Sequence, residues 1–267
     1  MVLRQRILTA LVLAPLALAG LFGLDGGAFA LFTALVLLLG AWEWARLAGF
    51  AATAPRLAYT AALGVALLVA WFAGWASAHW PLWLGVLGWL ANARWVMRYP
   101  DATHEWQRPG VRLAMGVWVL FPCWVGFYQL RQEGSEWLLF VLLLVWLADI
   151  GAYFSGRRFG RRKLARHVSP GKSWEGVYGG WVAVALLALA YALWLPFDLG
   201  QALGLLLLAL LVAMVSVVGD LFESMLKRFS GLKDSSHLLP GHGGILDRID
   251  SLTAAVPLFA LISPWLG

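Results

Sequence analysis

The sequence predicts an all-α, polytopic transmembrane protein with about nine membrane-spanning helices. Of its 267 residues, 61% are hydrophobic and only 13% are charged. Soluble domains carry roughly 45–50% apolar and about 25% charged residues. Apolar segments long enough to cross a bilayer as helices, about 20 residues each, recur along the whole chain. The basic residues fall almost entirely into alternate connectors between these segments, as expected for a membrane protein.

Each apolar segment defines one expected helix. The first follows Arg4 and Arg6, and its Ala17-Leu18-Ala19 sequence fits a signal-peptide cleavage site. Because the apolar run continues through Leu24 and another segment follows directly, we interpret it as a retained helix. The last segment is short, so a count of eight is the alternative. The segments are 7–24, 28–45, 57–75, 80–97, 111–130, 137–153, 176–195, 201–219 and 251–266.

The distribution of Lys and Arg predicts the orientation, because these residues collect in cytoplasmic loops. With the N-terminus inside and nine crossings, 19 of the 20 basic residues lie on the cytoplasmic side and only Arg131 lies outside. The sequence therefore predicts a cytoplasmic N-terminus and a C-terminus on the opposite side. Since the positive charge follows the membrane topology, nucleic acid is not an expected partner.

Two regions differ in their connectors. Residues 1–136 form N-terminal transmembrane helices with short connectors, whereas residues 137–267 also contain two long polar cytoplasmic loops, 154–175 and 220–250. Long loops between helices are more often functional than incidental. We therefore interpret 137–267 as the catalytic region.

The loop 220–250 contains two pairs of carboxylates with i, i+3 spacing. Asp220 and Glu223 share a face if the preceding helix continues beyond the membrane, and Asp247 and Asp250 repeat the spacing before the final segment. Converging carboxylates are favourable around a hard divalent cation, so these four residues are the candidate metal ligands. The alternative is a salt-bridge network with the nearby cations Lys227, Arg228, Lys233 and Arg248.

A glycine-rich turn, LPGHGGILD, separates the two acidic pairs. Gly243 and Gly244 permit backbone turns whose N–H groups point at phosphate oxygens, and Lys233 flanks the turn. His242 is a further candidate phosphate contact, although a lone histidine is more often a structural hydrogen-bonding residue. The turn is therefore expected to bind a phosphate group.

The loop 154–175 is rich in cations and ends in SPGKSWEG. The positive-inside rule and contact with anionic lipid headgroups would account for its arginines. They do not account for Ser169, Lys172 and Ser173, which lie just before a helix start, where anionic phosphate is favoured. The segment is not a Walker A loop, because Arg166 stands where that motif has glycine. The single cysteine, Cys123, excludes a cysteine zinc site and an intrachain disulfide.

The stretch 224–250, SMLKRFSGLKDSSHLLPGHGGILDRID, resembles the signature of the phosphatidate cytidylyltransferase (CDP-diacylglycerol synthase) family, and DIGAYFSGRRFGRRKL and SPGKSWEG resemble a second motif of that family. The resemblance implies a multi-pass enzyme of the bacterial inner membrane with a cytoplasmic active site. It also implies a homodimer in contact with membrane lipids. The signature positions present are Ser224, Lys227, Arg228, Lys233, Asp234, His242, Gly243, Gly244, Asp247, Arg248 and Asp250.

The same resemblance implies the reaction and its participants. CTP and phosphatidic acid would give CDP-diacylglycerol and pyrophosphate, with Mg²⁺ between residues equivalent to Asp220 and Asp247; Mn²⁺ as a substitute and a second cation are compatible with it. Catalysis would rest on positioning and electrostatics. The expected catalytic residues are Asp220, Asp247, Lys227 and Arg248, and the expected substrate-binding residues are Ser169, Lys172, Ser173, Lys233, His242, Gly243 and Gly244.

Two other functions remain open at this point. A related CTP-dependent membrane enzyme, such as a polyprenol kinase or an archaeal-type lipid cytidylyltransferase, would use the same kinds of residue. A kinase would release CDP rather than pyrophosphate. A transporter is disfavoured because its charged residues usually lie near the membrane midplane on broken helices, whereas these acids lie at the ends of segments.

Overall fold

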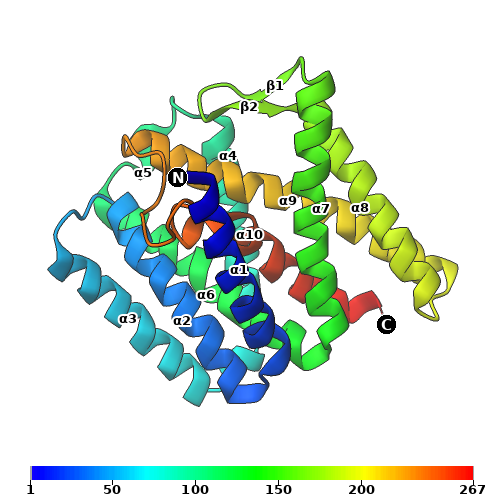
Figure 1. Ribbon diagram of the computed structural model, residues 1–267. Helices are drawn as coiled ribbons and strands as arrows, with labels where there is room; N and C mark the ends of the chain where they lie inside the picture. The colour runs from blue at the N-terminus through cyan, green and yellow to red at the C-terminus, as the bar shows by residue number, and fades with distance from the viewer. Residues whose placement is uncertain (1, 267) are drawn as a thin grey trace.

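A helix forms at each of the nine apolar segments (Figure 1). The computed structural model describes residues 2–266, without the side chains of residues 2–8 and of Ala10. The prediction that Arg4 and Arg6 lie on the cytoplasmic side therefore concerns side chains outside the described part of the chain. The long helices are α1 (Val2–Gly23), α2 (Gly26–Leu47), α3 (Thr53–Phe72), α4 (Trp80–Met97), α6 (Pro109–Glu133), α7 (Ser135–Phe159), α8 (Trp174–Trp194), α9 (Leu199–Phe229) and α10 (Leu246–Ile262).

Short elements occupy several connectors. They are η1 (Trp75–Ser77), α5 (Thr103–Trp106) and η2 (Ser263–Leu266), together with two strands, β1 (Lys163–Ala165) and β2 (Ser169–Ser173). The strands pair in antiparallel fashion, with Lys163 opposite Ser173 and Ala165 opposite Ser169. The expected loop 154–175 is therefore the end of α7 followed by a small hairpin, an addition to the all-α fold that was predicted.

The helices have the character of a polytopic membrane protein. Within residues 2–266, seven helices are long and apolar enough to cross a bilayer. The other two long helices are α1, whose apolar part is shorter, and α4, which contains Asn92 and Arg94. The count of nine crossings and the orientation of the termini stay predictions.

Glycines allow the helices to approach closely around the polar end of the bundle. A Cβ atom on Gly151 of α7 would lie 2.6 Å from the carbonyl oxygen of Gly179 on α8. A Cβ atom on Gly219 of α9 would lie 2.7 Å from the carbonyl oxygen of Asp250 on α10. Small residues permit such backbone contact between membrane helices. The second contact brings the acidic ends of α9 and α10 together.

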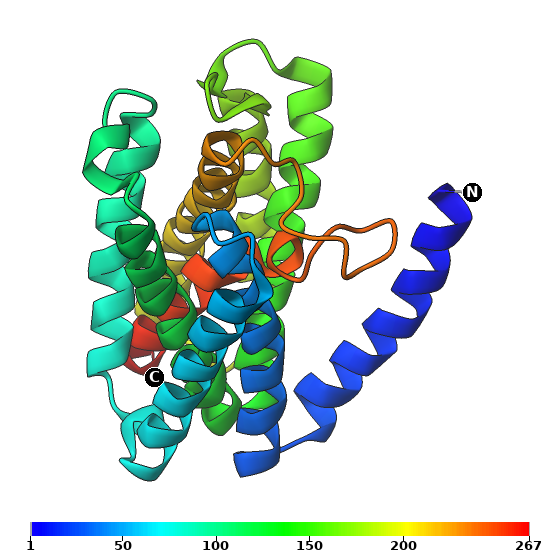
Figure 2. The ribbon, with the colours of Figure 1, turned by 90° about the vertical axis from the view of Figure 1, so that its left-hand side faces the viewer.

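Alternate connectors gather at opposite ends of the bundle. At one end, Arg131 pairs with Asp25 beside the α1–α2 turn, and Ser263 donates a hydrogen bond to Glu133. At the other end, the Ser230 hydroxyl donates to the Leu47 carbonyl oxygen at 2.9 Å. Figure 2 shows α1 leaning away from the other helices. This arrangement groups the connectors in the alternating pattern that the charges predicted.

Candidate active site

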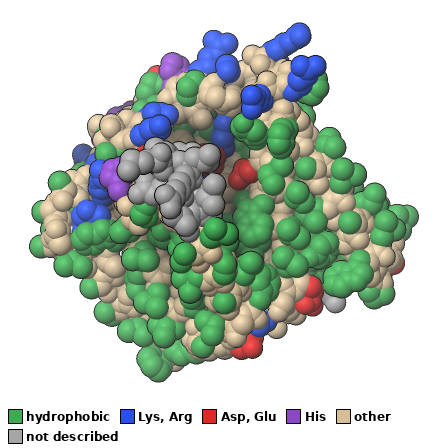
Figure 3. All heavy atoms as spheres, viewed as in Figure 1, with side chains coloured by type: hydrophobic (Ala, Val, Ile, Leu, Met, Phe, Trp, Pro, Cys, Tyr) green, Lys and Arg blue, Asp and Glu red, His purple; other side chains and the backbone are tan. Residues whose placement is uncertain are grey.

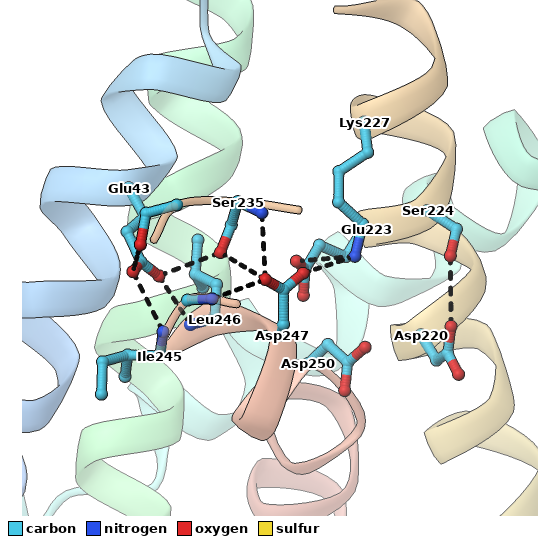
Figure 4. A network of polar contacts seen from close by, with 12 residues as sticks. Glu43, Asp220, Glu223, Ser224, Lys227, Ser235, Ile245, Leu246, Asp247 and Asp250 are labelled. Carbon is cyan, nitrogen blue, oxygen red and sulfur yellow. Dashed lines mark hydrogen bonds and ion pairs between the residues drawn. The ribbon is translucent and has the colours of Figure 1, made fainter. Parts of the chain in front are cut away.

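An acidic cluster lies where α9 and α10 meet (Figure 4). α9 continues through Phe229, so Asp220 and Glu223 stand one turn apart on it, as expected if the helix extended past its apolar part. Asp247 and Asp250 come from the first turns of α10, and Figure 4 shows Asp250 pointing towards Asp220. Both i, i+3 pairs therefore converge.

Two lysines contact this cluster. Lys227 Nζ lies 2.6 Å from Asp247 Oδ1 and 3.2 Å from Glu223 Oε1, all with side chains less than 15% exposed. Lys172 Nζ reaches from β2 to within 2.6 Å of Asp220 Oδ2. Three of the four carboxylates thus pair with two ammonium groups, and among the residues described Asp250 pairs with neither, so the largely buried site holds more carboxylates than ammonium groups.

Glu223 is the least satisfied of the four carboxylates. Both of its oxygens are buried without a hydrogen bond, although Lys227 lies nearby. A buried carboxylate without full compensation is costly, and an oxygen-liganded cation offsets that cost. Within residues 2–266, however, no three Asp, Glu, His or Cys side chains are grouped as a metal site. The donor chemistry suits Mg²⁺, while the lysines hold the carboxylates in ion pairs.

The glycine-rich turn folds against Asp247. Asp247 Oδ2 accepts hydrogen bonds from the backbone N–H of Gly244 at 2.8 Å and from both the backbone N–H and the hydroxyl of Ser235 at 3.0 Å. Gly243 adopts a φ of +87°, which favours glycine. The turn thus positions a carboxylate, and its Gly244 N–H is directed at Asp247. His242 lies partly exposed on the same turn, with Nδ1 buried and unpaired.

The hairpin and three helices enclose a cavity of about 500 Å³ next to the acidic cluster. Lys172 from β2, Asp220 from α9 and Asp149 from α7 provide its charged wall, along with Arg157. The rest is mostly apolar, including Val177 and Val217 as well as the backbone of several glycines. A phospholipid combines a phosphate group with apolar acyl chains, so a cavity with a lysine on one wall and apolar side chains on the rest is complementary to it.

The other expected binding residues lie at varying distances from this wall. Ser173 lines the cavity, but its hydroxyl accepts a hydrogen bond from Gly176 N at 3.2 Å and so caps α8. Ser169 opens β2 and faces the hairpin partner Ala165. Lys233 and Arg248 are exposed beyond the cluster. The structure therefore brings Lys172, Lys227 and the four acids together and leaves Lys233 and Arg248 at the surface.

Positive charge gathers on the hairpin beside this cavity. Lys and Arg side chains gather at one end of the molecule in Figure 3, while hydrophobic side chains cover most of its flank. Arg161, Arg162, Lys163 and Arg166 line a shallow pocket of about 420 Å³ on the hairpin, with Trp174 and Tyr178. Cations near the site favour the approach of polyanionic substrates.

Sequence reasoning missed two acidic residues. Glu43 on α2 is fully buried and contacts the segment 235–246, and Asp149 lines the cavity. Each had a detectable signal, since an ionisable residue inside or at the end of an apolar segment is a functional candidate by default. Glu43 stands between two tryptophans in AWEWARL.

An acidic site beside cationic, glycine-rich segments, at the ends of long apolar helices, fits a membrane enzyme that acts on phosphate groups. The chain belongs to the cytidylyltransferase family, whose model matches residues 4–265. A phosphatidate cytidylyltransferase of Pseudomonas aeruginosa is 53% identical over 262 residues, covering 97% of this chain and 96% of the relative. One of Haemophilus influenzae is 42% identical and covers 97% of each chain. One of Staphylococcus saprophyticus is 42% identical over 52% of this chain and 54% of the relative.

Proposed function

We propose that this chain transfers a cytidylyl group from CTP to phosphatidate, forming CDP-diacylglycerol and pyrophosphate in phospholipid biosynthesis. The observation that carries the proposal is the acidic cluster with its two lysines, set against a cavity whose remaining wall is apolar. Membership of the family and the names of relatives that match nearly end to end support the same reaction.

The reaction is an in-line displacement at phosphorus. A phosphate oxygen of phosphatidate attacks the α-phosphorus of CTP, and the bond from that phosphorus to the bridging oxygen of the β-phosphate breaks. Pyrophosphate leaves with the bonding electrons. The attacking phosphate is already ionised at neutral pH, so the chain needs to position the reactants and neutralise charge rather than supply a strong base.

Asp220, Glu223, Asp247 and Asp250 are the residues that would hold Mg²⁺. The bound cation would neutralise phosphate oxygens and stabilise charge in the transition state. Mn²⁺ is expected to substitute because it accepts the same oxygen ligands. A second cation fits the charge excess of the cluster.

The chain's own cations would hold the two substrates. Lys172 stands at the boundary between cavity and cluster, where it can contact the triphosphate of CTP while the acyl chains of phosphatidate lie along the apolar wall. Lys227 fixes Asp247 and Glu223, and Lys233, His242 and Arg248 lie on the segment that would face the triphosphate. Ser169, Ser173 and the glycines 243 and 244 shape the backbone at these contacts.

The membrane arrangement is part of the proposal. Nine crossings, with a cytoplasmic N-terminus and a periplasmic C-terminus, would place the cluster at the cytoplasmic face of a bacterial inner membrane, where CTP is available. This is supported by the grouping of alternate connectors at opposite ends of the bundle. A homodimer is expected from the family resemblance, and mass measurement of the detergent-solubilised protein would test it.

An acceptor panel tests the proposed substrate. The purified protein is incubated with labelled CTP, Mg²⁺ and, separately, phosphatidate, diacylglycerol, polyprenol or an archaeal-type ether-lipid phosphate. Labelled lipid should form with phosphatidate and require it. Preferential use of the polyprenol or the ether lipid would contradict the proposal.

A further inference from the structure

A fifth buried carboxylate, Glu43, lies outside the acidic cluster yet contacts the segment that builds it. Its side chain comes from α2 and is 0% exposed. The carboxylate accepts hydrogen bonds from the backbone N–H groups of Leu246 at 2.7 Å and Ile245 at 3.0 Å. It also accepts from the hydroxyl groups of Ser235 and Ser236. Among the residues described, no basic side chain forms an ion pair with Glu43, so these four donors compensate its buried carboxylate.

The backbone contacts place Glu43 at the N-terminus of α10. The first N–H groups of a helix have no acceptor within the helix, and an acceptor is normally supplied by a nearby side chain. Ile245 precedes α10 and provides no capping side chain. Glu43 fills this role from a helix about 200 residues earlier in the chain, and its negative charge suits the positive end of the helix dipole.

The hydroxyl of Ser235 connects Glu43 to the acidic cluster. Ser235 Oγ lies 3.1 Å from Glu43 Oε2 and 3.0 Å from Asp247 Oδ2 (Figure 4). A Cβ atom on Gly244 would lie 2.0 Å from Ser235 Oγ and 2.5 Å from Glu43 Oε1, so the turn closes directly over both groups. The first turns of α10, which Glu43 caps, also carry Asp247 and Asp250.

We propose that Glu43 is a positioning residue for cytidylyl transfer: it caps α10 from α2 and thereby sets Asp247 and Asp250 in place. It acts through the turn 235–246 and touches neither substrate. The N-terminal helices consequently contribute to the active site and do more than anchor it. The expected loss of kcat rests on the proposed function, whereas the expected loosening of segment 235–250 does not.

Glu43→Gln and Glu43→Asp separate capping from mere packing. Gln keeps the size but has one acceptor oxygen, and its NH₂ group would face the N–H donors of Ile245 and Leu246. Asp keeps both oxygens and the charge on a shorter side chain. Glu105→Gln is the control, because hydrogen bonds from Arg94 and Trp95 lower the pKa of Glu105 to about 2, so the variant also removes a charge. Glu105 lies on α5 and is bonded to Arg94 and Trp95, not to the residues of the cluster.

Three measurements on the detergent-solubilised protein test the proposal. In hydrogen exchange, segment 235–250 of Glu43→Gln should exchange at least about tenfold faster, while α7 and α8 are unchanged. Mn²⁺ affinity, read by electron paramagnetic resonance, should fall at least about tenfold. The kcat should fall about 100-fold or more with a smaller change in the KM for CTP. Glu43→Asp should recover part of each loss, and Glu105→Gln should match the wild type.

Wild-type exchange, Mn²⁺ affinity and kcat in a folded Glu43→Gln protein would overturn the proposal. If Glu43→Gln does not accumulate in the membrane, Ser235→Ala provides the test, since it removes only the hydroxyl that links Glu43 to Asp247. Ser235→Ala should also lower the affinity for Mn²⁺. Wild-type Mn²⁺ affinity in this variant would overturn the proposal that Glu43 acts on Asp247 through Ser235. A wild-type protein that makes no CDP-lipid would contradict the proposed function, whereas the exchange result would still decide the role of Glu43.

Discussion

Replacing Asp220 by Asn should remove activity while leaving the protein folded. Asn has nearly the same shape but no negative charge, so it weakens cation binding without opening a cavity. Asp220 makes one ion pair, to Lys172, and the two side chains are 30% and 26% exposed. A partly exposed pair of this kind contributes at most about 1 kcal/mol to stability. The Ser224 hydroxyl, 3.2 Å from Asp220 Oδ1, can still donate to the Asn oxygen.

The expected kinetic effect is much larger than the effect on stability. A cation that loses one of its charged ligands next to two polyanionic substrates should lose at least about 4 kcal/mol of transition-state stabilisation, which is about 1,000-fold in rate. The assay follows the incorporation of labelled CTP into lipid in mixed micelles. The Mg²⁺ concentration is varied from about 0.1 mM to about 50 mM, so that a weakened cation site can still be filled at the upper end. Partial recovery at high Mg²⁺ or with Mn²⁺ is expected. Near-normal turnover at low Mg²⁺ would refute the assignment of Asp220 as a ligand.

The remaining predictions test the neighbouring contacts and the topology. Asp247→Asn should abolish turnover and also destabilise the protein by about 3–5 kcal/mol, because Asp247 is in a buried ion pair with Lys227; an active, fully stable variant in thermal unfolding would contradict this. Lys172→Ala should raise the KM for CTP more than that for phosphatidate. Equal changes in the two KM values in steady-state kinetics would contradict a specific contact between Lys172 and the triphosphate. Gly219→Ala should lower activity at least about tenfold, because its Cβ would clash with the carbonyl oxygen of Asp250 and displace the start of α10. Unchanged kinetics would show that α10 can shift without loss of activity. A reporter after Gly267 should be periplasmic and one near Gly160 cytoplasmic; a cytoplasmic reporter at Gly267 would mean eight crossings.

The positions of the helices could be predicted from the sequence, but their ends could not. Apolar segments mark where a helix crosses lipid, and a helix formed at each of the nine. Hydropathy does not mark where hydrogen bonding stops. α7 therefore runs on to Phe159 and α9 to Phe229, through polar residues that local pattern assigns to loops. The continuation of α9 is what places Asp220 and Glu223 on one face.

The spacing of the acids predicted part of the candidate site. Two i, i+3 pairs at helix ends were enough to expect convergence, and all four carboxylates lie near the junction of α9 and α10 (Figure 4), although within residues 2–266 no three of them form a group that could hold a metal ion. The partners of these acids were harder to predict. Lys172 reaches Asp220 because a hairpin folds 154–175 back over the cluster, and strands of three and five residues leave little signal in a basic loop.

Glu43 shows why the rest of the site escaped prediction. Its four donors lie about 200 residues away, and no local spacing connects α2 to the N-terminus of α10. Ser173 is a similar case on a smaller scale. A hydroxyl just before a helix is consistent with phosphate binding and with capping, and in the structure it accepts the N–H of Gly176. Which role a polar residue takes depends on the tertiary partners that reach it.

The fate of the three phosphates of CTP tests the central claim most directly. The purified protein receives phosphatidate, Mg²⁺ and CTP labelled either at the α-phosphate or at the γ-phosphate, and lipid and aqueous products are separated. Cytidylyl transfer predicts that the α-label enters the lipid and that the γ-label appears in pyrophosphate, one for each CDP-diacylglycerol formed. Transfer of the γ-label to lipid, with release of CDP, would show a kinase and contradict the account.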